Sequence, residues 1–294
     1  MIEQGRFSLN RIVYPRLDIA GFFELASRLG IRKVELRNDI PGGILDGQSP
    51  EQVRTLAKKN SVKIITINAL QNFNNASQLP ELLGELTELL KVAVSVECEA
   101  VILCPSNSKS DRRSREQILE ETVGALKTFR PYFEESGLFG YLEPLGFMNC
   151  SLRSLADAMN AIRESRGKNY KIVYDTFHHF IGPDTAATIE KGYDVSYTGL
   201  VHVSGVTSQV SPDQYTDDVR VMLGPEDRIG NIKQIALLDK LGYRGNISFE
   251  PFSKEVHELD IRGIEETIRQ SVKFIQNMAD RPASVSRASS PGTT

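Results

Sequence analysis

Short runs of apolar and β-branched residues alternate along the chain with longer stretches in which apolar residues return at every third or fourth position. The short runs are almost continuously apolar, which is typical of parallel strands covered on both faces. The pattern therefore predicts eight parallel strands, at residues 7–13, 33–36, 63–68, 100–103, 138–143, 171–175, 198–203 and 246–250.

The stretches between these runs have the period of amphipathic helices. In the first of them, Ile19, Phe22 and Ala26 fall at three- and four-residue steps, which gathers them on one helical face. We expect helices at residues 18–29, 50–59, 79–96, 116–136, 151–165, 185–191, 232–241 and 263–278. Three glycines stand just past helix ends, where a left-handed residue is most often needed: Gly30, Gly137 and Gly242.

Eight strand–helix units of about 35 residues each predict a (β/α)8 TIM barrel, an α/β fold that forms a single domain. A doubly wound open sheet is the competing architecture, but no Gly-x-Gly-x-x-Gly or phosphate-binding loop follows the first strand. We expect one barrel over residues 1–280. Residues 281–294 are rich in Ser, Pro, Ala and Gly without apolar periodicity, which predicts a disordered tail.

Composition and charge narrow the class of protein. Of the 294 residues, 40% are hydrophobic and 25% are charged, which fits a globular chain with a large core and excludes a disordered or collagen-like one. Lysine and arginine number 35 against 38 aspartates and glutamates, so the formal net charge is -3. A protein that binds nucleic acid by neutralising phosphates usually carries a positive surplus. We therefore expect no nucleic-acid partner.

The chain shows no membrane or export signal. No run approaches the ~18 apolar residues that a bilayer crossing needs, and the first residues lack a basic segment followed by an apolar one. Cys98, Cys104 and Cys150 lack C-x-x-C metal spacing and indicate reduced thiols in a cytoplasmic protein. A nucleophilic role for Cys104 would need an activating partner that the sequence does not place.

Four ionisable residues stand at the ends of the fifth to eighth strands: Glu143, Asp175, His202 and Glu250. Catalytic groups of a (β/α)8 barrel sit at the C-terminal ends of its strands, and three carboxylates buried at one rim are costly unless a cation neutralises them. This donor set suits Mn²⁺ or Mg²⁺, with Zn²⁺ and Co²⁺ as alternatives. A single such carboxylate is commonly a helix cap or ion-pair partner, but four on consecutive strands favour a metal site.

Other polar residues lie on the same rim. Glu35 and Arg37 close the second strand and Asn68 closes the third, where a salt bridge and a turn cap are the structural alternatives. His178 lies in the loop above the sixth strand, and His179 beside it should point elsewhere.

Two later residues have simple structural interpretations. Arg220 follows two aspartates in the long loop after the seventh strand, and surface ion pairing is the plain explanation for it. His257 lies in a charged late segment, where we expect it to be solvated.

Several short strings carry a resemblance to a known family: Leu142-Glu143-Pro144, Tyr174-Asp175-Thr176-Phe177-His178, Val201-His202-Val203 and Phe249-Glu250-Pro251-Phe252. They resemble the xylose-isomerase-like barrel family of sugar isomerases and epimerases. Within that family, Val34-Glu35-Leu36-Arg37, Ile67-Asn68-Ala69-Leu70 and Phe73-Asn74-Asn75 are similar to the inosose isomerases (2-keto-myo-inositol isomerases) of bacterial inositol catabolism. The similarity covers residues 7–278.

The resemblance implies roles for individual residues. It puts the metal ligands on the four strand-end residues already selected, and it implies that four others face the substrate: His178, Arg220, Glu35 and Asn68. The implied reaction moves a carbonyl between adjacent carbons of a polyhydroxy ketone, 2-keto-myo-inositol to 1-keto-chiro-inositol, through a cis-enediolate. One metal-linked carboxylate, Glu143 or Glu250, would remove the proton. The partner is a small polyol ketone or sugar, and a homo-oligomer is left open.

Two segments depart from the family pattern. The relatives carry Gly-x-Gly-x-Ile-Asp after the arginine loop, whereas residues 224–231 here lack the second glycine, and His179-Phe180 replaces an aromatic residue followed by histidine. We expect both segments to roof the pocket.

The alternatives to this isomerase function are an inosose dehydratase, a ketose 3-epimerase or hydroxypyruvate-type isomerase, a metal-dependent apurinic endonuclease on the same barrel, and a non-catalytic sugar-binding barrel.

Overall fold

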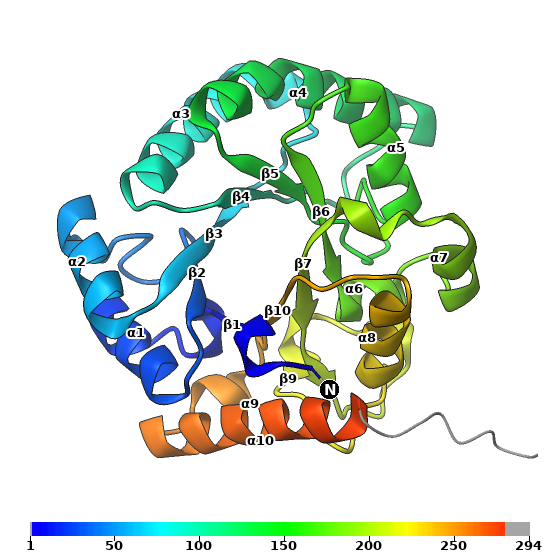
Figure 1. The fold of residues 1–294 in the computed structure, drawn as a ribbon. Helices are drawn as coiled ribbons and strands as arrows, with labels where there is room; N and C mark the ends of the chain where they lie inside the picture. Colours follow the sequence, from blue (N-terminus) through cyan, green and yellow to red (C-terminus); the bar gives the residue numbers. More distant parts are fainter. Residues whose placement is uncertain (1, 280–294) are drawn as a thin grey trace, which may run out of the picture.

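Eight parallel strands close into a barrel in the computed structural model, which describes residues 2–279 (Figure 1). Around the wall they follow the order β1-β10-β7-β6-β5-β4-β3-β2. Their bounds are β1 Phe7–Asn10, β2 Lys33–Arg37, β3 Lys63–Leu70, β4 Ala100–Leu103, β5 Phe139–Leu142, β6 Tyr170–Asp175, β7 Thr198–Val203 and β10 Asn246–Phe249. The predicted single (β/α)8 barrel is confirmed. The tail predicted at 281–294 lies outside the described residues.

Helices form a ring outside the strands (Figure 1). Their bounds are α1 Ile19–Arg28, α2 Pro50–Asn60, α3 Leu79–Ser95, α4 Arg115–Ser136, α5 Leu155–Ser165, α6 Thr176–Ile181, α7 Ala186–Gly192, α8 Asn231–Lys240, α9 Lys254–His257 and α10 Ile261–Ala279. The glycines predicted at helix ends have the left-handed conformation, with φ of 69° at Gly30, 71° at Gly137 and 102° at Gly242. Within residues 2–279, none of the helices has the length and apolar character that spanning a membrane requires.

The first strand is shorter than its apolar run. The side chain of Asn10 accepts a hydrogen bond from the backbone N–H of Ile12, and residues Arg11–Val13 turn into a 3-10 helix. Ile12 and Val13 are nevertheless buried. Burial thus keeps the sequence apolar beyond the last residue that pairs with a neighbouring strand.

Two elements at the mouth of the barrel were not predicted. Helix α6 begins directly after β6, because the Asp175 carboxylate accepts hydrogen bonds from the backbone N–H groups of Phe177 and His178. A short antiparallel hairpin, β8 (Gly205–Val206) with β9 (Arg220–Val221), folds the loop after β7 back toward the barrel.

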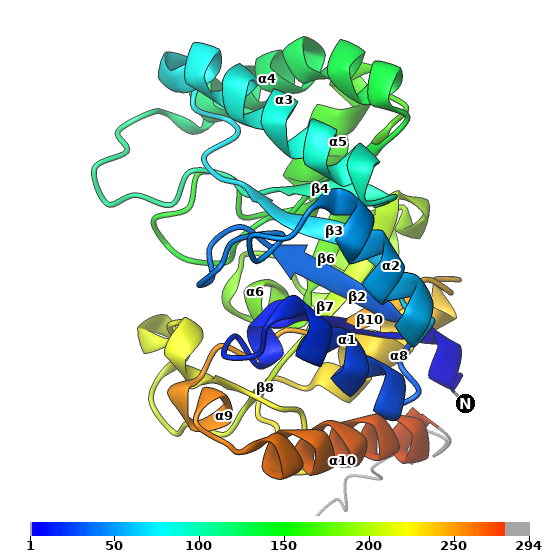
Figure 2. The ribbon, with the colours of Figure 1, turned by 90° about the vertical axis from the view of Figure 1, so that its left-hand side faces the viewer.

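A cluster of apolar side chains forms a plug inside the barrel: Ile65, Ala69, Ile102, Cys104, Val173 and Leu200. The polar residues at the strand ends lie above this plug. In Figure 2 the arrowhead of β2 and the long loops face the same side of the molecule. That side is the C-terminal mouth, where a TIM barrel builds its site.

Candidate metal centre and its cavity

Four side chains from four neighbouring strands meet at the mouth. Glu143 follows β5, Asp175 ends β6, His202 lies in β7 and Glu250 follows β10. Each offers one ligand atom, these atoms all lie within 4.8 Å of one another, and all four residues are buried. The structure thus brings together the four residues that the strand-end argument selected.

Two arginines neutralise part of this cluster. The Nη2 of Arg220 lies 2.6 Å from Oδ2 of Asp175 and 3.0 Å from Oε2 of Glu250. The Nη1 of Arg37 donates to Oε1 of Glu250 at 2.9 Å. Burial raises the pKa of Glu250, but His202 and the two guanidinium groups outweigh it and hold that pKa below its ordinary value. Glu250 is therefore a firmly ionised carboxylate.

The imidazole of His202 lies between carboxylates on both of its nitrogen atoms. Its Nδ1 is 2.8 Å from Oε1 of Glu143 and 3.1 Å from Oε2 of Glu250. Its Nε2 is 3.1 Å from Oε2 of Glu35. Burial lowers the pKa of His202, but these three carboxylates raise it well above its ordinary value. When Nε2–H donates to Glu35, Nδ1 is left facing the other ligand atoms.

Glu35 lies behind His202, away from the cavity. It is fully buried, and its carboxylate also accepts hydrogen bonds from Thr66, from Asn68 at 3.1 Å and from Ser248. Burial raises the pKa of Glu35, but His202 outweighs that effect, so the pKa lies below its ordinary value. The structure places Glu35 where it orients the imidazole, not where a substrate would contact it.

The predicted alternative of surface ion pairing for Arg220 is wrong. Its side chain is 1% exposed, its Nε donates to Oγ of Ser204 at 2.9 Å, and its guanidinium lies over the ring of Phe252 at 4.8 Å. The hairpin β8–β9 folds the loop inward and carries Arg220 with it. Arg37 lies over the same ring at 5.2 Å, so both guanidinium groups pack on Phe252.

A cavity of about 230 Å³ opens above the cluster. Both glutamates, Glu143 and Glu250, line it, whereas Asp175 and His202 do not. Eight more polar or charged residues line it: Arg37, Asp39, Asn68, Gln71, Asn107, His178, Asp217 and Arg220. Two carboxylates of the cluster therefore face one small polar space, with the other two members of the cluster beneath them.

The neighbouring histidines point in different directions, as expected. His178 lines the cavity, is 4% exposed, and its Nδ1 has no hydrogen-bond partner among the described residues. His179 packs against the ring of Tyr174, with 4.9 Å between ring centroids, and burial lowers its pKa. The prediction that His257 is solvated is only partly right, because its Nε2 lies 3.2 Å from the carbonyl oxygen of Pro251 and half of the side chain is covered.

Cys104 is a poor nucleophile in this setting. It lines the cavity with its Sγ 3.7 Å from Oε2 of Glu143. Burial and the neighbouring carboxylate raise the pKa of its thiol well above the ordinary value, which keeps it protonated.

The loop at residues 224–231 lines neither the small cavity nor its larger neighbour, so the expectation that it roofs the pocket is wrong. Instead, the Asp227 side chain accepts hydrogen bonds from the backbone N–H groups of Val206 and Asn231, which stabilises the hairpin.

The residues present fit a divalent cation. Three carboxylates and an imidazole Nδ1 form an oxygen-rich donor set, and a buried carboxylate holds the other nitrogen of the imidazole, as is usual for histidine ligands. The sequence argument placed Arg37 on the rim but gave it no role in the site, and it gave none to Phe252 or to Asn10, whose Nδ2 donates to Glu250 at 3.0 Å. The only local signal was the position of Arg37, two residues after Glu35 and hence on the same face of β2.

Comparison with known proteins gives a consistent result. A family model described as the xylose isomerase-like TIM barrel matches residues 23–278. A crystal structure of a xylose isomerase domain-containing protein from Salmonella typhimurium has a TM-score of 0.88 and 38% identity over 94% of this chain and 99% of that one. A crystal structure of the IOLI protein with a bound zinc atom has a TM-score of 0.85 and 20% identity over 93% and 99%. The inosose isomerase of Halalkalibacterium halodurans is 23% identical over 240 residues, 80% of this chain and 83% of that protein.

Proposed function

This chain belongs to the xylose isomerase-like TIM barrel family, and from that premise we propose that it is a divalent-metal-dependent isomerase of a polyhydroxy ketone of the inosose type. The proposed reaction moves a carbonyl between adjacent carbons of the ring, as in 2-keto-myo-inositol to 1-keto-chiro-inositol. The observation that carries the proposal is the pair of glutamates, Glu143 and Glu250, that face one small polar cavity above Asp175 and His202. The similarity to an inosose isomerase supports the substrate class.

Glu143, Asp175, His202 through Nδ1 and Glu250 would hold the cation. Mn²⁺ suits this donor set best, with Zn²⁺, Mg²⁺ and Co²⁺ as alternatives. When bound, the cation polarises the ketone, acidifies the neighbouring C–H and offsets the negative charge that develops on oxygen. The zinc atom bound by a structural relative of the same fold supports a divalent metal in this chain.

The charges around the cavity favour a neutral substrate. Arg37 already pairs with Asp39 at 2.7 Å and with Glu250, and Arg220 already pairs with carboxylates of the cluster. Neither guanidinium is therefore free to bind a carboxylate or phosphate of the substrate. Hydroxyl groups can still accept hydrogen bonds from the remaining N–H groups of the arginines and donate to the amide oxygen of Asn68, whose Nδ2 already donates to Glu35 and Thr66. This suits a polyol ring and disfavours hydroxypyruvate.

Glu143 is the better proton acceptor of the two glutamates. The oxygens of Glu250 accept hydrogen bonds from Asn10, Arg37 and Arg220, which stabilise its negative charge and weaken it as a base. Within residues 2–279, Oε2 of Glu143 has one hydrogen-bond donor, the thiol of Cys104 at 3.7 Å. We assign Glu143 the removal of the proton from the hydroxyl-bearing carbon next to the ketone.

The proton and the two oxygens then exchange roles. Loss of the C–H proton to Glu143 gives a cis-enediolate. The proton on Glu143 exchanges with solvent, and delivery of a proton from Glu143 to the former ketone carbon places the carbonyl on the adjacent carbon. A hydroxyl proton moves between the two oxygens in the same exchange, so the product is an isomer of the substrate. His178, which lines the cavity, is positioned to orient one of these hydroxyl groups.

The test is incubation of the Mn²⁺-loaded protein with 2-keto-myo-inositol in D₂O. The proposal expects deuterium at the carbon next to the carbonyl and a product of otherwise unchanged mass. Loss of one water would identify an inosose dehydratase, and inversion at one carbon without a carbonyl shift would identify a 3-epimerase. Glu143→Gln is the matched variant, and we expect it to block deuterium uptake. An unchanged substrate in the wild-type reaction would refute the proposal.

A further inference from the structure

A second cavity of about 620 Å³ adjoins the small one. Asn107, Phe147 and Asp217 line both of them, so the two spaces share a boundary. None of the four cluster residues lines the larger cavity. A ligand held above the glutamates would therefore enter this outer cavity only through a substituent that passes Phe147.

Aromatic rings form one wall of the outer cavity. Tyr215 stacks between Phe177 and Phe180, with ring-centroid distances of 6.3 and 6.4 Å. Phe180 is 39% exposed and Met148 is 74% exposed, although both are large and apolar. Only five large hydrophobic residues of the described chain are this exposed, and two of them line this one cavity. Exposed apolar groups gathered in a cavity indicate a binding surface.

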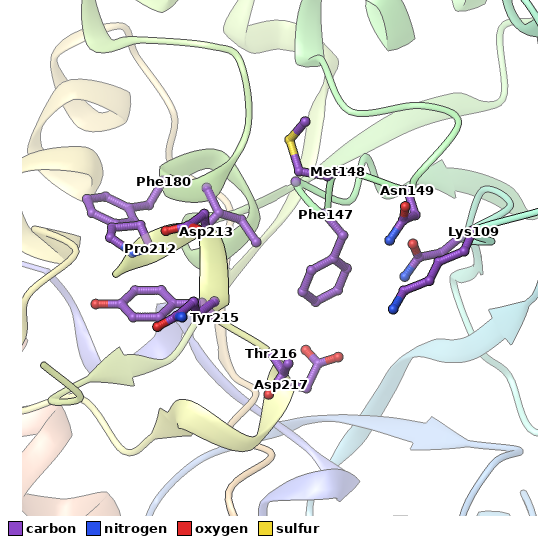
Figure 3. Close-up of a pocket in the computed structure, with 14 residues that line it drawn as sticks. Lys109, Phe147, Met148, Asn149, Phe180, Pro212, Asp213, Tyr215, Thr216 and Asp217 are labelled. Carbon is purple, nitrogen blue, oxygen red and sulfur yellow. The ribbon is translucent and has the colours of Figure 1, made fainter. Parts of the chain in front are cut away.

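Polar groups form the opposite wall. Figure 3 shows Phe180 and Tyr215 on one side, Lys109 and Asn149 on the other, and Phe147 between them. A sugar ring has the matching character, because its C–H face packs on aromatic rings and its hydroxyl groups bond to amide and ammonium donors. The volume, more than twice that of the inner cavity, leaves room for such a ring.

The charges favour a neutral occupant here as well. Lys109 is the one basic residue among those that line the outer cavity, and Asp213 and Asp217 line it too. Asp217 is paired with Arg220 at 3.1 Å, which leaves one ammonium group and one unpaired carboxylate of the described residues facing the space. A phosphate group would thus gain little from this surface.

We propose that the outer cavity binds a second, neutral sugar ring, so that the substrate is a glycoside of the polyhydroxy ketone. The inference rests on the function proposed above, because it places the ketone ring in the inner cavity. Phe180 and Tyr215 are then specificity-determining residues that contact the glycosyl group. Phe147 stands where the glycosidic bond crosses from one cavity to the other.

The experiment measures binding by titration calorimetry on the full chain loaded with Mn²⁺. The probes are myo-inositol and the set of its monoglucosides, one for each hydroxyl, all of which lack the ketone and are not turned over. We expect one glucoside to bind at least about tenfold more tightly than myo-inositol. Phe180→Ala should remove most of that ratio. Ile261→Ala should preserve it, because Ile261 is similarly exposed, at 37%, but lines neither cavity.

Each outcome separates the two proposals. If myo-inositol binds and no glucoside binds more tightly, the outer site is wrong while the proposed isomerase remains. The outer site is also wrong if Phe180→Ala keeps the full ratio. If no probe binds, the glycoside inference fails, whereas the D₂O reaction above still decides the proposed function, because these probes lack the ketone.

Discussion

The two sides of the barrel mouth carry similar polar residues and use them differently. The segments after β5 and β10 present Glu143 and Glu250 to the cavity. Strands β1 and β2 carry Asn10 and Glu35, which line no part of it and instead hold Glu250 and His202 in place. The first pair is thus arranged for contact with a substrate, and the second pair supports side chains of the cluster.

Depth in the barrel explains the difference better than residue type. Glu35 and Arg37 lie on the same face of β2, yet Arg37 lines the cavity while Glu35, two residues earlier, lies below it beside His202. Side chains inside a TIM barrel stack in layers. A step of two residues along a strand therefore moves a side chain from the supporting layer to the layer that faces the cavity.

The strongest test of this comparison is Glu250→Gln, which changes a residue of the cavity layer. It removes a proposed ligand and leaves Arg37 and Arg220 without their shared carboxylate. We expect turnover to fall by about 10⁴-fold and the metal content after desalting to drop, with an unchanged circular dichroism spectrum. Glu258→Gln, on an exposed carboxylate, is the control. Near-normal turnover in Glu250→Gln would contradict the two-glutamate site.

The next test, Glu35→Gln, changes the supporting layer. The amide still accepts a hydrogen bond from Nε2 of His202 but no longer stabilises the imidazole by charge. We expect the affinity for Mn²⁺ to fall by about 10–100-fold, measured by equilibrium dialysis. Saturating Mn²⁺ should restore turnover here and not in Glu250→Gln. Failure of excess metal to restore turnover would place Glu35 in the chemistry itself.

The adjacent histidines sharpen the comparison within a single helix. His178→Asn removes a group that lines the cavity, and we expect kcat/KM to fall by about tenfold, the effect of one lost hydrogen bond. His179→Asn changes a residue packed on Tyr174 and should lower the melting temperature while KM stays the same. Steady-state kinetics and thermal unfolding on both variants decide. Equal changes in KM would mean that the two side chains do not differ in function.

The smallest effect is expected one step further from the cavity, at Thr66→Val. This variant keeps the shape of the side chain and removes the hydroxyl that donates to Glu35. We expect the free energy of unfolding to fall by about 1–3 kcal/mol in a urea titration, with turnover reduced only about threefold. Thr55→Val, on the exposed face of α2, is the control. A loss of turnover as large as that in Glu250→Gln would contradict the layered arrangement.

Most strands and helices could be predicted from the sequence, because the spacing of apolar residues differs between the two kinds of element. The clearest error is at the first strand, where Ile12 and Val13 extend the apolar run beyond the last paired residue, Asn10. Helix α6 was missed since its six residues are too few to show a helical period.

The candidate site was readable only in part. Glu143, Asp175, His202 and Glu250 were found because the carboxyl ends of parallel strands in a closed barrel meet at one rim. Their pairing was not. The resemblance turned Arg220 toward the substrate, but nothing near it in the sequence shows that a hairpin brings it to Asp175 and Glu250.

The sequence by itself determined the eight strand–helix units, and with them the edge at which the strand-end carboxylates and the imidazole gather. These features depend on local period and on the order of residues along each strand. Only the tertiary structure decided that Glu35 supports His202, that two arginines share Glu250, and that an aromatic outer cavity adjoins the inner one. Such relations depend on the register between strands and on where long loops fold, and both are set by contacts between segments far apart in the chain.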